Sequence, residues 1–453
     1  MKKYLLLLLL LIPLKVYATN AKEVTNESSF YINNSKLTRL SDGNVKTNQK
    51  IDVGNSLVIQ NDNDKIKQLY IVYEITSSKG SLLTEEGETV KLGENEFLHE
   101  YIDVLNPSGK ITITYENAVT ISEIRLFTEG DTPSDIQKWT REDSADLMIF
   151  STHADDEQLF FSGVMPTYIN KDKKIHVVYF ARHDVGAYYA PSRLHEQLDG
   201  LWTLGVTDYP TFGIIPDAYS EDINTARSQM NAAGFTDDDV IKFYVEQIRK
   251  YKPKVILGHD ENGEYGHGQH RLNIDILKKA YEKAFDTSYT ESSLEVYTVP
   301  KFYIHLYDLD NKTILNYDLP LEKYDGKTAY EISKEGYKKH LSQQYTWFTK
   351  WLNGNNNEYT SATQITKYNP AYWGLYKTTV GPDIEKNDLF ENIVEEDIPD
   401  EELVEEFKQV PQKKRIDSLY CKYRETIIII LGSIIIICMV MIVVLKKTEL
   451  KKE

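Results

Sequence analysis

The segment ADLMIFSTHADDEQLFF, residues 145–161, decides how the longest part of this chain folds. An apolar run suited to a buried strand ends directly before His153, Asp155 and Asp156. In an open parallel sheet the ligand site lies beyond the carboxyl ends of the strands, which is where these side chains fall. Read by itself, the segment fits either a polar strand end with a helix cap or a metal site with a base beside it.

A second polar cluster, GHDENGEYGHGQHR at residues 258–271, also follows an apolar run, KVIL. It supplies His259, His267 and His270. The three-residue spacing of His153 and Asp156 lets both point to one side of a helix, while Asp155 projects differently. His267 and His270 repeat this spacing. One of them can complete a His/Asp/His site for a borderline metal such as Zn²⁺, with a position left open for water.

Strand and helix patterns alternate around both clusters, which indicates an α/β fold. The strands are expected at ADLMIFS, KIHVVYFA and KVILGH, and the helices at PSRLHEQLDGLWTLGV, TDDDVIKFYVEQIRKY and GQHRLNIDILKKAYEKAF. Another apolar run, KFYIHLY, follows them. The predicted domain covers residues 140–382. It is Rossmann-like, with a mostly parallel sheet and helices on both faces.

Residues 20–130 have a different pattern, in which short runs such as SLVIQ and GKITITYE are separated by turn signals such as NDND. This spacing predicts an antiparallel β-sandwich. The stretches LSDGNVKT at 40–47 and ISEIRLFTEG at 121–130 resemble discoidin-like (galactose-binding-like) domains. The resemblance implies carbohydrate binding.

Both ends of the chain predict export and anchoring. Residues 1–18 have a basic start, an apolar run and small side chains before a polar segment, as in a signal peptide. Residues 426–445 carry no charge and are long enough to form one transmembrane helix. The acidic and basic segment 383–425 would then be an extracellular stalk, and residues 446–453 a cytoplasmic tail. The prediction is a single-pass cell-membrane protein whose catalytic domain is extracellular.

The charge and the cysteine content of the chain bear on its partners and on the kind of organism it comes from. The formal charge of -17 argues against nucleic-acid binding, because phosphate contacts need a basic surface. Both cysteines, Cys421 and Cys438, lie beside or within the predicted membrane helix, so the exported part has none for a structural disulfide. A Gram-positive bacterial surface protein fits this pattern.

The pair HADDE and NGEYGHGQHR resembles the LmbE/PIG-L family of zinc-dependent N-acetylglucosamine deacetylases. The similarity extends from Ala145 to about Tyr376, and it includes an Arg193/Glu196 helix that ends in LGV. The resemblance implies an amide hydrolase that binds Zn²⁺, or another divalent metal such as Fe²⁺. Its partner would be a GlcNAc-containing glycan or glycolipid.

The resemblance also implies a role for each matching position. It makes His153, Asp156 and His270 the metal ligands and Asp155 the general base. It makes His267 the residue that stabilises the oxyanion, places Tyr265 near the acetyl group and makes Arg193 a substrate contact. Ala154 and Gln269 depart from the family pattern, in which a proline and an aspartate stand at these positions. The change at Gln269 leaves the protonation state of His267 open.

The remaining histidines and aromatic residues receive simpler interpretations. We expect His183, His195, His305 and His340 to be surface or structural residues. Most of the 32 tyrosines should lie in the cores, and YNPAYWGLY at 368–376 is the candidate for lining a groove. The leading function is removal of N-acetyl groups from GlcNAc-containing surface glycans. The alternatives are a hydrolase of a small N-acyl conjugate and a non-catalytic carbohydrate-binding surface protein.

Overall fold

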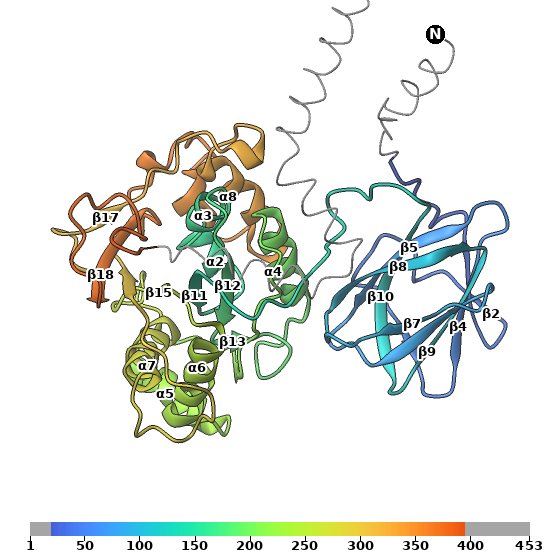
Figure 1. The fold of residues 1–453 in the computed structure, drawn as a ribbon, viewed down its shortest axis with the longest axis horizontal. Helices are drawn as coiled ribbons and strands as arrows, with labels where there is room; N and C mark the ends of the chain where they lie inside the picture. The colour runs from blue at the N-terminus through green and yellow to red at the C-terminus, as the bar shows by residue number, and fades with distance from the viewer. Residues whose placement is uncertain (1–19, 395–453) are drawn as a thin grey trace, which may run out of the picture. The chain divides into compact units, whose positions relative to one another are not determined.

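A six-stranded sheet forms the middle of the C-terminal domain in the computed structural model, which describes residues 20–394. Its order is β12-β11-β15-β16-β18-β17 (Figure 1). The first four strands are parallel, whereas β18 runs antiparallel to both β16 and β17. The strands of this domain are β11 Leu147–Ser151, β12 Ile175–Tyr179, β13 Ala181–Arg182, β14 Ile215–Pro216, β15 Val255–Gly258, β16 Lys301–His305, β17 Thr313–Ile314 and β18 Tyr372–Thr378.

Helices cover both faces of this sheet, with α5, α6 and α7 on one side and α2, α3, α4 and α8 on the other (Figure 1). Along β11, Leu147 and Ile149 belong to one core, while Met148 and Phe150 belong to the other. Every residue of β11 is therefore buried, as expected of a parallel strand between two helical layers. The helices are α2 Asp156–Leu159, α3 Val164–Ile169, α4 Ser192–Thr203, α5 Ile223–Ala232, α6 Asp237–Tyr251, α7 Gly268–Ala284, α8 Ala329–Tyr337 and α9 Thr349–Asn353, with short 3₁₀ turns at Glu322–Tyr324, Leu341–Gln343 and Ala362–Gln364.

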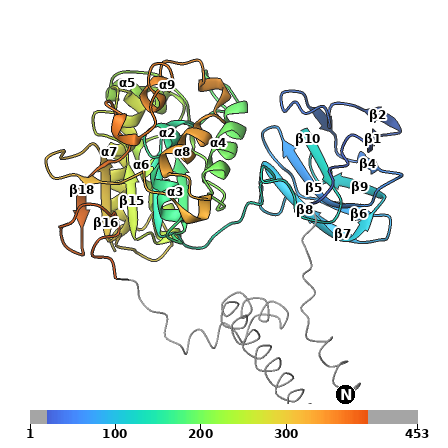
Figure 2. The same ribbon diagram turned by 90° about the horizontal axis from the view of Figure 1, so that it is seen from above.

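Two antiparallel sheets precede this domain (Figure 2). One has the order β2-β1-β4-β9-β6-β7, and the other has the order β3-β10-β5-β8. Their strands are β1 Ser29–Ile32, β2 Ser35–Leu37, β3 Gln49–Ile51, β4 Ser56–Gln60, β5 Ile66–Tyr73, β6 Gly80–Thr84, β7 Thr89–Leu92, β8 His99–Ser108, β9 Lys110–Tyr115 and β10 Val119–Phe127. Buried and less buried residues alternate along β4 and β9, as they do in a sheet with one face toward a core. The α/β class and the antiparallel sheets before it are confirmed.

Several elements were not predicted from the sequence. Helices α5 and α8 and strands β17 and β18 lie outside the predicted set. The groove candidate YNPAYWGLY largely forms β18, and Trp373 in it is fully buried against Phe161 and His305. Burying the apolar surface of this tryptophan inside the domain is more favourable than leaving it exposed on a groove.

The folded chain continues past residue 382, where the predicted stalk begins. Asp383 forms an ion pair with Lys301, and both side chains are almost completely buried. Leu389 is also fully buried, and its backbone N–H donates to the hydroxyl of Tyr168 at 2.7 Å. The prediction that a solvated stalk begins at residue 383 was wrong in this respect. Asp383 does not face water, because it pairs with the buried Lys301.

Among residues 20–394, no helix is long and apolar enough to cross a bilayer. The predicted signal peptide (1–18), membrane helix (426–445) and cytoplasmic tail (446–453) lie outside the described residues, as does most of the predicted stalk.

Candidate metal centre and active site

Two neighbouring strand ends bring the predicted site residues together. Strand β11 ends at Ser151, and the chain turns through His153 into the short helix α2, which begins at Asp156. Strand β15 is paired with β11 in parallel and leads to the loop that ends at His267, the N-cap residue of α7. His270 then lies in the first turn of that helix.

Three potential ligand atoms converge between these strand ends. The Oδ2 atom of Asp156 lies 3.0 Å from Nδ1 of His153 and 3.0 Å from Nε2 of His270. The two imidazole nitrogens are 3.3 Å apart. All three side chains are buried, and they are the three that the family resemblance makes metal ligands.

Gln269 fixes the tautomer of His153. The side-chain oxygen of Gln269 accepts the N–H of Ala218 at 3.1 Å, and its NH₂ group donates to the carbonyl of Pro216 at 3.0 Å. The same oxygen lies 2.8 Å from Nε2 of His153, so that nitrogen must carry the proton. In the neutral ring, the unprotonated Nδ1 of His153 therefore faces Asp156 and His270.

Glu264 fixes the tautomer of His270 in the same way. Its carboxylate lies 2.7 Å from Nδ1 of His270 and 3.1 Å from Nδ1 of His259. His305 Nδ1 is 3.0 Å away, and the backbone N–H of Asp260 donates to the same carboxylate at 3.0 Å. Because a carboxylate only accepts, Nδ1 of His270 donates to Glu264, and in the neutral ring the lone pair on Nε2 points toward Asp156.

Converging lone pairs on two imidazoles and a carboxylate repel one another unless a cation lies between them. Burial alone would lower the pKa of His270, yet Asp156 and Glu264 raise it to about 10. Burial would raise the pKa of Asp156, but His270 and His153 hold it well below the usual range. The site thus stabilises positive charge, and its two nitrogens and one oxygen suit a borderline divalent metal such as Zn²⁺.

His259 lies close to these three residues, but both of its ring nitrogens are occupied by hydrogen bonds and neither is free to bind a metal. Among the described residues, two groups of three have potential ligand atoms within 4.8 Å of one another: His153, His267 and His270 form one, and Asp156, His259 and His270 form the other. However, Nε2 of His259 accepts the N–H of Thr152 at 3.0 Å, and its Nδ1 donates to Glu264. His259 therefore supports the site through hydrogen bonds.

Asp155 stands beside the converging atoms without belonging to either potential metal group of the described chain. Its Oδ1 accepts from Arg193 at 2.8 Å, and Arg193 also donates to the carbonyl of Ala154. Burial raises the pKa of Asp155 to about 7, although Arg193 opposes this shift. Its φ of 113° lies in a region that favours glycine, and such strain is typical of functional sites. Arg193, which was predicted to contact the substrate, thus donates a hydrogen bond to the candidate base Asp155.

His267 presents one nitrogen to the site. Its Nδ1 accepts the backbone N–H of Gln269 at 3.2 Å, so the neutral ring carries its proton on Nε2. Burial, with His153 and His270 nearby, lowers the pKa of His267 to about 2. Tyr265 packs beside it, with ring centroids 5.6 Å apart. Gln269 contacts His153 through its side chain and His267 only through its backbone.

Sequence reasoning missed several supporting residues. Asp217 follows β14, and its carboxylate lies 3.4 Å from Nε2 of His153, 3.2 Å from Nδ1 of His183 and 3.5 Å from Arg193. The four histidines expected to be surface or structural residues are all buried, which excludes the surface alternative for His183, His195, His305 and His340. The isolated positions of Asp217 and His183 in the sequence gave no signal, because only folding places them beside His153.

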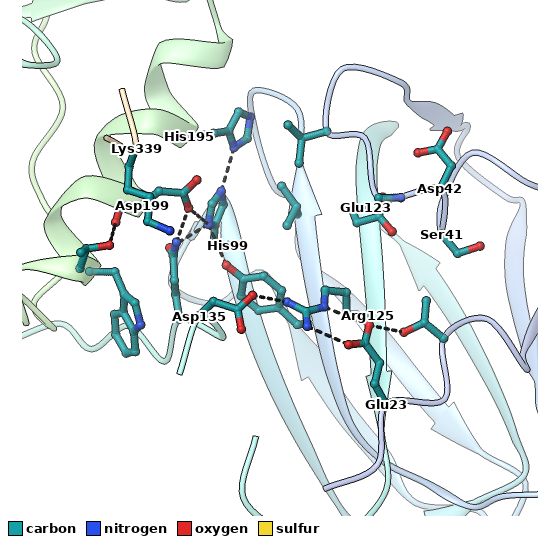
Figure 3. A pocket seen from close by; sticks show the side chains of 18 of the residues that line it. Glu23, Ser41, Asp42, His99, Glu123, Arg125, Asp135, His195, Asp199 and Lys339 are labelled. Atoms are coloured by element: carbon teal, nitrogen blue, oxygen red, sulfur yellow. Dashed lines mark hydrogen bonds and ion pairs between the residues drawn. The ribbon is translucent and has the colours of Figure 1, made fainter. Parts of the chain in front are cut away.

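A separate pocket of about 570 Å³ lies on the outer face of the β3-β10-β5-β8 sheet, where α4 approaches it (Figure 3). His99 of β8 lies 2.8 Å from His195 of α4, and Arg125 is paired with Glu23 and Asp135. None of the predicted catalytic or metal-binding side chains lines this pocket. It is therefore distinct from the candidate active site.

Residues 148–281 match the family model described as PIG-L: GlcNAc-PI de-N-acetylase. Two curated relatives are named 1D-myo-inositol 2-acetamido-2-deoxy-alpha-D-glucopyranoside deacetylase. The one from Catenulispora acidiphila is 23% identical over 175 residues, covering 35% of this chain and 54% of its own length. The one from Saccharopolyspora erythraea is 27% identical over 176 residues, covering 34% of this chain and 63% of its own length.

The structure also resembles the N,N'-diacetylchitobiose deacetylase from Pyrococcus horikoshii, with 12% identity and a TM-score of 0.37. That similarity covers 51% of this chain and 84% of the other. This chain therefore spans less than two thirds of the length of either curated relative, 54% of the first and 63% of the second. The part of the chain that matches the family model, residues 148–281, includes both strand ends of the site.

Proposed function

We propose that this protein is a metal-dependent N-deacetylase that hydrolyses the acetamide of a GlcNAc-type sugar. The observation that carries the proposal is that two adjacent aspartates have different partners in the site. Asp156 points at His153 and His270, whereas Asp155 is held by Arg193 next to them. A ligand set with a separate carboxylate base is what metal-assisted amide hydrolysis requires.

The metal and the base have distinct tasks. A divalent metal bound by His153, Asp156 and His270 would supply a water of lowered pKa and polarise the amide carbonyl. Asp155 removes a proton from the attacking water, and the same carboxyl returns it to the leaving nitrogen. Arg193 holds Asp155 in position for both transfers. The products are acetate and a free amino sugar.

His267 completes the site as a hydrogen-bond donor. The neutral ring carries its proton on Nε2, because Nδ1 accepts from the backbone of Gln269. An N–H group placed beforehand in a buried site stabilises an oxyanion more strongly than water does. This role needs no positive charge on the ring, so the aspartate-to-glutamine difference at Gln269 leaves it intact.

We further propose that the enzyme acts at the cell surface on a glycan or glycolipid. This part rests on the sequence, in which a leader at 1–18 precedes a single uncharged span at 426–445. Anchoring places an enzyme near polymeric or lipid-linked targets. A non-catalytic adhesin is disfavoured, because a decayed site would not keep His153, Asp155, Asp156 and His270 together.

Acetate release from the purified protein tests the proposal. The substrates are GlcNAc polymers, lipid-linked GlcNAc and small N-acyl conjugates, each with added Zn²⁺ or Fe²⁺ and with chelator. We expect metal-dependent release from GlcNAc substrates and its loss in His270→Ala. The matched control is His176→Ala, which removes another buried histidine, stacked on Tyr251 away from the ligand set. Release that survives His270→Ala would contradict the proposal.

A further inference from the structure

Four aromatic rings form a continuous row across the candidate active site. The ring of Tyr219 lies 5.2 Å from that of His267, measured between centroids. His267 lies 5.6 Å from Tyr265, and Tyr265 lies 6.0 Å from Trp347. The two inner rings, His267 and Tyr265, are two of the predicted catalytic residues, so the row passes through the candidate active site.

The two outer rings are exposed, unlike the inner ones. Tyr219 is 51% exposed and Trp347 is 56% exposed, whereas His267 is buried. Trp347 is the only tryptophan among the described residues with such exposure, since Trp139, Trp351 and Trp373 are buried and Trp202 is half-buried. Large aromatic side chains left in water beside a reacting centre are typical of a binding surface.

Neighbouring aromatic side chains also hold Trp347 in place. Its ring lies 4.7 Å from that of Phe348 and 4.7 Å from that of Trp351. Trp351 packs in turn against Tyr265 at 5.1 Å. On the other side, the hydroxyl of Tyr219 donates to Glu221 at 3.1 Å. Each outer ring is therefore contacted by neighbouring side chains while about half of its surface stays exposed, and a ring held in this way loses little entropy when a ligand stacks on it.

We propose that Tyr219 and Trp347 bind sugar units adjacent to the N-acetyl sugar that is hydrolysed, so that the substrate is an oligosaccharide or polysaccharide. This inference rests on the proposed deacetylase function. A pyranose ring has a face of C–H groups that packs on an aromatic ring and an edge of hydroxyls that stays in water. A small acyl conjugate would fill only the centre of the row and leave both outer rings unused.

The proposal predicts that binding improves with chain length. Contacts to remote sugar units lower KM, and any part of that binding energy that orients the acetamide raises kcat. The probes are N-acetylchito-oligosaccharides of one to six units. We expect kcat/KM of the metal-loaded protein to rise with length. In Tyr219→Ala and Trp347→Ala the ratio of kcat/KM for the six-unit substrate to kcat/KM for the single-unit substrate should fall by roughly three- to tenfold each.

Two further variants separate stacking from structural damage. Trp347→Phe keeps an aromatic ring and should retain most of the length dependence. Phe285→Ala is the matched control, because Phe285 is an exposed aromatic residue at the opposite end of α7 from His267. It should behave as the unaltered protein does. A rate independent of chain length, or an unchanged length dependence in both alanine variants, would overturn the proposal.

A binding measurement distinguishes this failure from failure of the proposed chemistry. Binding of the same oligosaccharides to the Asp155→Asn protein is followed by calorimetry and by the change in tryptophan fluorescence that is absent when Trp347→Phe is added. Affinity that rises with length without any acetate release from the unaltered protein would support the sugar-binding row and contradict the deacetylase. Acetate release without length-dependent affinity would contradict the row alone.

Discussion

Nε2 of His153 donates a hydrogen bond to the side-chain oxygen of Gln269 at 2.8 Å. The orientation of the Gln269 amide is set independently by Ala218 and Pro216, one a donor and the other an acceptor. As a result, the nitrogen of His153 that faces Asp156 is the unprotonated one. A residue that departs from the family motif thus orients one of the expected metal ligands.

Replacing Gln269 by leucine should weaken metal binding. The variant keeps a similar volume but removes the acceptor for His153, so the ring loses its fixed tautomer. We expect metal affinity to fall by roughly 10- to 100-fold, measured by competition with a chromogenic chelator. Gln197→Leu is the matched control, since Gln197 is a buried glutamine on α4. Equal metal affinities in the two variants would show that the Gln269 contact is dispensable.

Glu264→Gln should also weaken metal binding, for a different reason. The carboxylate accepts from His270 and His259, and an amide in its place would turn an NH₂ group toward at least one of these N–H donors. It would also remove a negative charge that raises the pKa of His270. We expect a further loss of roughly 10- to 100-fold in metal affinity, measured by calorimetric titration. Unaltered affinity would contradict the supporting role of Glu264.

The Lys301–Asp383 ion pair should matter for stability rather than for catalysis. Both side chains are buried, and Asp383 also accepts from Tyr303. Asp383→Ala leaves a buried lysine without its counter-ion, which costs about 3–5 kcal/mol of unfolding free energy. The double variant Lys301→Met/Asp383→Leu should recover much of that loss in urea unfolding. A single variant as stable as the parent would place residue 383 outside the folded domain.

His176 should make stability fall at acidic pH. Burial lowers its pKa, although Asp208 at 2.7 Å opposes the shift. In the unfolded chain the pKa of the His176 imidazole is about 6.5. As pH falls below that value, the unfolded state takes up a proton that the folded state does not, and the free energy of unfolding decreases. His176→Gln should show a shallower decrease between pH 7.5 and 5.5. Identical slopes would mean that His176 does not contribute.

The sequence allowed the site to be located because parallel strands end at one edge of a sheet. The apolar runs before His153 and before His259 are unambiguous strands, and each is followed at once by polar residues. The same logic could not find Asp217, since β14 consists of only two residues. Nor could it find the role of Glu264, whose partners include His305 from another strand, 41 positions away.

Some features depended on tertiary contacts that no local pattern encodes. The sequence predicted that the tyrosine-rich segment 368–376 lines a groove, but much of it forms β18, with Trp373 buried against Phe161 and His305. The acidic composition after residue 383 suggested a solvated stalk, but the partner of Asp383 lies 82 residues earlier. In both cases the deciding interaction joins residues far apart in the chain.

The most direct test of the account compares Asp155→Asn with Asp156→Asn, by elemental analysis of bound zinc and by acetate release from the same preparations. Asp156 lies 3.0 Å from both ligand nitrogens, so Asp156→Asn should lose metal and activity together. Asp155→Asn should retain stoichiometric metal while kcat falls by roughly 10² to 10⁴, the usual contribution of a general base. Loss of metal from Asp155→Asn with retention in Asp156→Asn, or no effect of either substitution, would contradict the account.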